Sequence, residues 1–141
     1  MIMTDSMRDF ASAKTTNLLA ELVAALNAAE RAPDVETVHK VRVATRRLQQ
    51  GLRLFRPYLS KKGLGKIKVE LRAIMDVAGE LRNRDIAVEL VKDVKDGSET
   101  LIETLLAQRA EFDRDFANVL RRSARPDLAL VWRSKLGLQT S

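Results

Sequence analysis

The chain has 141 residues, of which 45% are apolar, 31% charged and only 4% aromatic, a composition that suits one globular domain with an aliphatic core. Lys and Arg number 25 against 19 Asp and Glu, a net charge of +6 that favours anionic partners such as phosphates, nucleic acid or acidic membranes. Cysteine is absent, which excludes disulfides and thiolate zinc sites and fits a reducing compartment.

Helical periodicity runs through almost the whole sequence, because apolar residues recur every three or four positions. The chain has six Gly and three Pro, which leaves little turn chemistry for many short strands. We therefore predict an all-α fold, one domain over residues 1–141, built as a bundle of about five to six helices.

The first two expected helices are separated by Pro33. One is expected over residues 6–32, and Pro33 ends it. Its apolar stripe includes Phe10, Leu18, Leu22 and Leu26. Asp34 is a suitable N-cap for the second helix, which is expected over residues 35–56.

The second half of the chain is divided by further glycines and prolines. We expect a third helix over about 64–78, a bend over 79–85 and a fourth helix to about Val94. A loop at Asp96–Ser98, in which Ser98 can cap the next helix, is followed by a fifth helix over 99–122 and a short last helix from Pro126 to before Gly137. Trp132 is expected to pack this last helix onto the core or onto a partner chain.

The second expected helix carries a stripe of basic residues apart from its core face. At about 100° per residue, Val41, Leu48 and Leu52 fall on one side of the helix. The other flank carries His39, Arg42, Arg46, Gln50 and Arg53, with Arg47 further round. No Asp or Glu occurs between Val38 and Ser60. Because like charges at helical spacing repel each other, an external anion, or carboxylates from another helix, must complete this stripe.

The third expected helix repeats the pattern, since Lys68 and Arg72 lie together on one flank and Arg82 follows at the expected bend. If the two helices pack antiparallel, their flanks jointly line a positive groove. Guanidinium groups present paired donors that match phosphate oxygens, and His39 adds another donor. The sequence therefore predicts a phosphate-binding surface.

Two stretches resemble the motifs of the CHAD domain family, helical domains named for a histidine. Residues 38–48 read VHKVRVATRRL and resemble the first motif; residues 79–85 read GELRNRD and resemble the second, a Gly followed by an Arg-Asp pair. The resemblance implies an all-helical fold that binds inorganic polyphosphate around a central pore or groove. The residues it carries over are His39, Arg42, Arg46, Arg47, Lys68, Arg72 and Arg82, to which the basic stripe adds Arg53.

The sequence departs from the family pattern in two respects. Asn83 stands where the family usually has Asp, which changes an ion pair or cap at the expected bend. The usual domain contains two helical halves, whereas this chain resembles about one half and has one His-Arg motif. We therefore expect a homodimer about a two-fold axis. The absence of an export signal, with the resemblance, predicts a cytoplasmic location and allows association with polyphosphate granules.

Other functions use the same cations. Sequence-nonspecific nucleic-acid binding is one, although no helix-turn-helix or aromatic stacking platform is evident; an acidic-protein docking scaffold is another. The arginines also suit an ordinary solvated face, or ion pairs with Glu21, Glu70 or Glu80. Hydrolysis of phosphoanhydrides needs metal or a placed base, and no converging carboxylates are evident. We therefore expect no enzyme, no metal and no cofactor, and no membrane partner.

Overall fold

The computed structural model describes residues 2–93, 98–123 and 127–138, with side chains described from residue 6 onward except that of residue 98. These residues form α1 (Ile2–Arg31), α2 (Val35–Leu54), the 3-10 turn η1 (Arg56–Tyr58), α3 (Lys61–Lys92), α4 (Ser98–Ser123) and α5 (Leu128–Lys135). No strand occurs among them. The predicted all-α class is confirmed.

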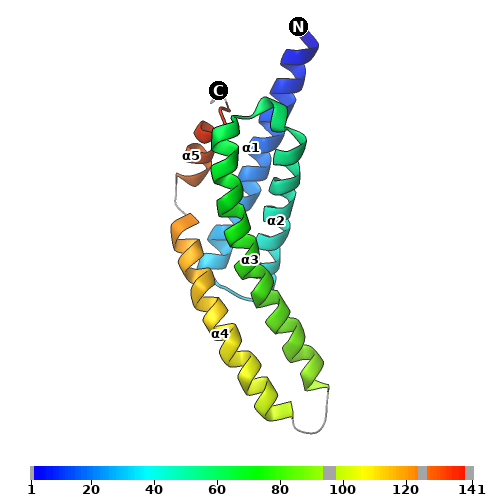
Figure 1. Cartoon of the computed structure of the whole chain (residues 1–141), viewed down its shortest axis with the longest axis vertical. Helices are drawn as coiled ribbons and strands as arrows, with labels where there is room; N and C mark the ends of the chain where they lie inside the picture. The colour runs from blue at the N-terminus through cyan, green and yellow to red at the C-terminus, as the bar shows by residue number, and fades with distance from the viewer. Residues whose placement is uncertain (1, 94–97, 124–126, 139–141) are drawn as a thin grey trace.

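The helices form a bundle at one end of the molecule and a bare hairpin at the other (Figure 1). Helices α1 to α4 run alternately up and down, with α2 between α1 and α3 and with α4 along the lower part of α3. The short α5 packs against α1 and α3 near the end where both termini lie. Below the α1–α2 pair, α3 and α4 continue as two helices alone.

The start of α2 is fixed by a reciprocal cap. The Asp34 carboxylate accepts a hydrogen bond from the backbone N–H of Thr37 at 2.8 Å, and the Thr37 hydroxyl accepts one from the Asp34 N–H at 2.9 Å. Two amides that a helix end leaves unpaired are thereby satisfied. The predicted N-cap is confirmed, and it sets where the basic stripe of α2 begins.

The bend expected over residues 79–85 is wrong, because α3 is one helix of 32 residues. A glycine inside a helix costs only about 1 kcal/mol relative to alanine. The buried stripe of Ile74, Ala78, Leu81 and Val88 runs straight through the segment. Asp85, which interrupts this stripe, receives a hydrogen bond from Arg109 of α4, with Nε and Oδ1 2.6 Å apart. Packing against α4 therefore outweighs the local signal.

The start of α3 also precedes the expected one. The helix begins at Lys61, and the Ser60 hydroxyl accepts a hydrogen bond from the Gly63 N–H at 3.5 Å. Ser60 is therefore the N-cap, and the first turn reaches further toward α5 than the sequence suggested.

Of the two aromatic residues predicted to pack into the core, Trp132 does so and Phe10 does not. Trp132 is fully buried and anchors α5 to the bundle. Phe10 is 59% exposed, so its expected place in the core is wrong, although its ring and that of Phe55 form an edge-to-face pair with centroids 6.0 Å apart. Of the expected loop at Asp96–Ser98, residues 96 and 97 lie outside the described residues, as does the expected helix start at Pro126, whereas Ser98 is already the first residue of α4. Over the part of the chain that is described, no helix is long and apolar enough to cross a membrane.

Candidate functional site: a basic groove between α2 and α3

The antiparallel packing of α2 and α3 brings their basic flanks together. At one end, a groove of about 460 Å³ opens between the two helices. Its lining residues are Arg46, Gln49, Gln50, Leu52, Arg53, Lys68 and Arg72. Four residues that the sequence singled out on two separate helices thus face one shared space.

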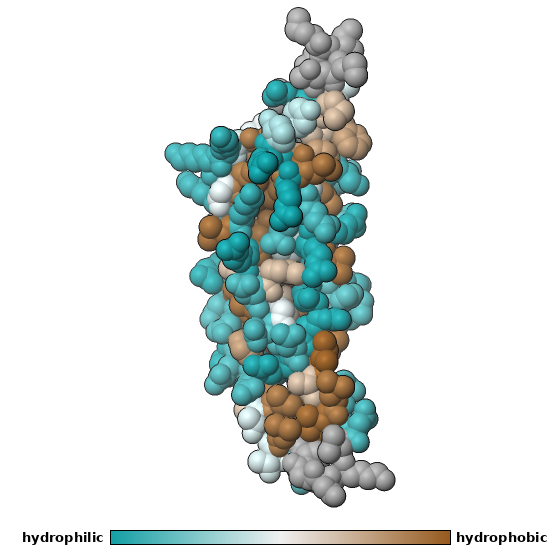
Figure 2. Space-filling view, turned by 45° about the vertical axis from the view of Figure 1, so that its right-hand side comes forward, coloured by the Kyte–Doolittle hydropathy of each residue, from teal (hydrophilic) through white to brown (hydrophobic). Residues whose placement is uncertain are grey.

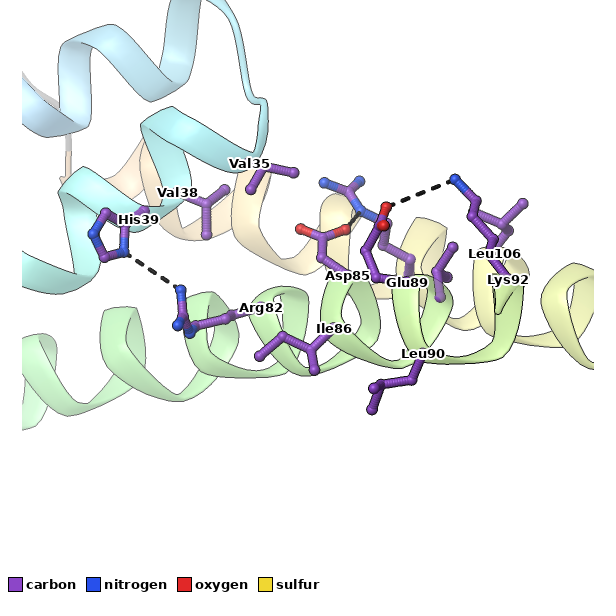
Figure 3. A pocket seen from close by; sticks show the side chains of 12 residues that line it. Val35, Val38, His39, Arg82, Asp85, Ile86, Glu89, Leu90, Lys92 and Leu106 are labelled. Carbon is purple, nitrogen blue, oxygen red and sulfur yellow. Dashed lines mark hydrogen bonds and ion pairs between the residues drawn. The ribbon is translucent and has the colours of Figure 1, made fainter. Parts of the chain in front are cut away.

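The other end of the same seam is closed by a contact between His39 and Arg82. The Arg82 Nη1 lies 3.5 Å from the His39 Nδ1, and Figure 3 shows the two side chains pointing toward each other from α2 and α3. Because a guanidinium only donates, Nδ1 is the acceptor in this contact and the other ring nitrogen carries the proton. That second nitrogen remains a donor for an anion.

Arg42 lies on the same flank of α2 as His39, about one helical turn further along. Its side chain is half-buried, and its Nε is buried without a hydrogen-bond partner. Burial, followed by the positive charges of Arg82 and Arg46, lowers the pKa of Arg42. An arginine remains charged at neutral pH all the same. The cluster therefore holds like charges at a free-energy cost that a bound anion would remove.

Carboxylates do not neutralise this seam. Of the eight residues predicted as binding residues, only Arg47 lies within 4.0 Å of a carboxylate in the described structure. We call the other seven the basic groove. It consists of His39, Arg42, Arg46, Arg53, Lys68, Arg72 and Arg82.

Arg47 is set apart from the basic groove. Its Nη1 lies 3.0 Å from the Glu21 carboxylate of α1, and it lines a separate hollow between α1 and α2. One of the ion pairs that the sequence left open is therefore formed. Glu80, a second acid considered for the stripe, lies 3.7 Å from Arg84 instead.

Two polar lining residues were not among the predicted binding residues, namely Gln49, which was missed from the sequence, and Gln50, which was placed on the basic flank without an assigned role. Both stand between Arg46 and Arg53, one helical turn from each, so their spacing was the available signal. Their amides add uncharged donors to the cationic ones. Among the residues that the structure describes, no three His, Cys, Asp or Glu side chains gather closely enough to hold a metal ion.

An apolar groove continues from the His39–Arg82 end, with a volume of about 620 Å³. Four exposed apolar side chains line it, namely Val35, Ile86, Leu90 and Leu106. Figure 2 shows apolar residues gathered toward this lower end of the molecule, with hydrophilic residues over the face above. The basic groove thus leads directly onto an uncovered apolar surface of the α3–α4 hairpin.

The comparisons with known proteins agree with the motifs. A family model described as CHAD domain matches residues 15–141, nearly the whole chain. No curated protein and no solved structure shows a significant match. The two motif stretches lie on α2 and α3 and contribute His39, Arg42, Arg46 and Arg82 to the basic groove.

Proposed function

Since the chain belongs to the CHAD domain family, which is associated with polyphosphate binding, we propose that its basic groove binds inorganic polyphosphate. The observation that carries the proposal is that the seven groove residues have no carboxylate partner within 4.0 Å in the described structure. From His39 to Arg53 the groove follows 15 residues of α2, whose 14 steps span about 21 Å at the helical rise. This length suits a linear anion with several successive charges better than a single phosphate.

The composition of the groove favours polyphosphate over nucleic acid. Single-stranded nucleic acid is held by base stacking on aromatic side chains as well as by cations. The lining of the groove between α2 and α3 includes no aromatic residue. A chain of phosphates without bases needs only the donors and charges that are present.

The test of the function is the salt dependence of binding. If about six or seven cations each replace a counterion, affinity for long-chain polyphosphate should fall about a thousandfold between roughly 50 and 200 mM salt. Titration calorimetry at four salt concentrations measures this slope. Single-stranded RNA and duplex DNA serve as competitors; if either displaces polyphosphate at equal concentration of charge, nucleic acid is the better assignment. Binding that is insensitive to salt contradicts the groove as the site.

We also propose that the protein holds polyphosphate without cleaving it, in the cytoplasm and on polyphosphate granules. The groove supplies hydrogen-bond donors and positive charge, and phosphoanhydride hydrolysis requires in addition a metal or a placed base. Release of phosphate from polyphosphate with Mg²⁺ or Mn²⁺ at substrate turnover would show that the protein does cleave polyphosphate. A fluorescent fusion that remains diffuse in granule-containing cells would overturn the proposed location on polyphosphate granules.

We further propose that two copies of the chain associate through the apolar groove of the hairpin. Its four exposed apolar residues have no cover in the single chain, and isolated patches of this kind mark interaction surfaces. Because this groove shares His39 and Arg82 with the basic groove, a second copy seated there would join two basic grooves into a longer one.

Association predicts a monomer for the variant Leu90→Glu/Leu106→Glu, because each glutamate would be buried without a partner in the interface. Sedimentation velocity should show a dimer for the natural sequence and a monomer for the variant. Leu130→Glu on α5 is the matched control, since Leu130 is 59% exposed against 65% for Leu90 but lies outside the groove. A natural sequence that sediments as a monomer contradicts this proposal and leaves polyphosphate binding untouched.

A further inference from the structure

Four helical glycines of this chain fall into two classes by the space around them. A Cβ at Gly51 would lie 2.5 Å from Leu18, and one at Gly63 would lie 1.8 Å from a backbone oxygen. A Cβ at Gly65 or at Gly79 would meet nothing within 4 Å. The first two glycines are therefore required by packing. The other two, both inside α3, weaken the helix without any packing reason.

Gly65 and Gly79 share one line along α3 with the groove cations. Successive members of this line are three, four or seven residues apart, which keeps them on one face of a helix. The line consists of Gly65, Lys68, Arg72, Gly79 and Arg82. Lys68 and Arg72 line the groove, and Arg82 contacts His39. The two glycines without a packing role thus lie on the groove face of α3.

The antiparallel register places Gly79 across from Arg42. His39 lies opposite Arg82. Because α2 and α3 are antiparallel, Arg42, three residues after His39, corresponds to Gly79, three residues before Arg82. Arg42 is the arginine whose Nε is buried without a partner and which is repelled by Arg46 and Arg82. The open space at Gly79 therefore adjoins the groove cation with the greatest need of an anion.

We propose that Gly79 keeps a phosphate position open on α3, between Arg42, Arg72 and Arg82, with Gly65 leaving similar room further along. This proposal rests on the proposed function and specifies how that site is built. The amides of a helix interior already donate to the helix, so Gly79 supplies room and no hydrogen bond. A phosphate group lies against the helix surface there, close enough for guanidinium groups from both helices to bind it.

The test replaces Gly79 by a neutral residue that favours the helix. Gly79→Gln should weaken binding of long-chain polyphosphate about tenfold or more, because its side chain fills the phosphate position. Its thermal midpoint should stay equal to that of the natural sequence or rise, since glutamine suits a helix better than glycine. Gly79→Ala, which adds one methyl group, should give a smaller loss of about threefold.

Ala73→Gln is the matched control, because it puts the same side chain on an exposed position of α3 that lies about 120° round the helix from Gly79. Its affinity should remain within about twofold of the natural sequence. Equal binding by Gly79→Gln and the natural sequence overturns this inference and leaves polyphosphate binding standing. A lowered thermal midpoint for Gly79→Gln also overturns it, since the glycine would then serve packing. No binding by the natural sequence would instead refute the proposed function itself.

Discussion

The double variant Arg42→Glu/Arg46→Glu is expected to lose polyphosphate affinity by about a thousandfold or more while it stays folded. Each change removes a cation from the groove and places a negative charge there, so two attractions become two repulsions. Arg42 is half-buried and Arg46 exposed, and neither belongs to the apolar core. The mutual repulsion of Arg42, Arg46 and Arg82 disappears as well. Titration calorimetry and circular dichroism measure affinity and fold in the same samples.

A matched charge change on α4 separates the groove from the net charge of the protein. Arg114 and Arg122 are exposed, lie outside the basic groove and have no carboxylate within 4.0 Å in the described structure. Arg114→Glu/Arg122→Glu should therefore retain affinity within about fivefold at moderate salt, where charges beyond about 10 Å are screened. Equal losses in the two double variants mean that net charge and not the groove governs binding. Full affinity in Arg42→Glu/Arg46→Glu means that the anion binds elsewhere.

The basic flank of α2 was predictable because it depends on spacing within one helix. The helical period groups Arg42, Arg46 and Arg53, and the lack of acids from Val38 to Ser60 is visible in the sequence. The ion pair of Arg47 could not be predicted from spacing within α2. Arg47 belongs to the same motif, but its partner Glu21 lies on another helix, and only the packing of α1 against α2 brings the two together.

The wrong predictions concern features that depend on contacts with other helices. A break at Gly79 follows from local propensity, yet the pairing of Asp85 with Arg109 and the continued apolar stripe keep α3 one continuous helix. Phe10 continues the apolar pattern of α1, but it remains largely exposed in the bundle. The apolar groove depends on how far the α3–α4 hairpin extends past α2, which periodicity within single helices does not determine.

The variant Gly63→Ala is expected to lose about 3 kcal/mol or more of unfolding free energy. The new Cβ would lie 1.8 Å from the carbonyl oxygen of Lys135 and 2.4 Å from its carbonyl carbon. Backbone atoms cannot relieve a clash by a change of rotamer, as side-chain atoms can. The two segments are also tied together, since the Ser60 N–H donates to the Leu136 carbonyl at 2.9 Å. Relief of the clash therefore requires α5 to move, and α5 carries the buried Trp132.

Gly65→Ala is the control that isolates this clash, because it makes the same change two residues away in open space. It should stabilise the helix by up to about 1 kcal/mol, so the two variants should shift the thermal midpoint in opposite directions. For Gly63→Ala we expect a fall of about 10 °C. Trp132 is the one tryptophan of the chain, so its fluorescence maximum reports directly whether α5 leaves the core. Equal stability of the two alanine variants would show that the backbone of α5 does not pack closely against α3 at Gly63. The contact that makes one glycine indispensable comes from a helix more than 60 residues later in the chain, which is why neighbouring glycines that look alike in the sequence are expected to respond oppositely to the same methyl group.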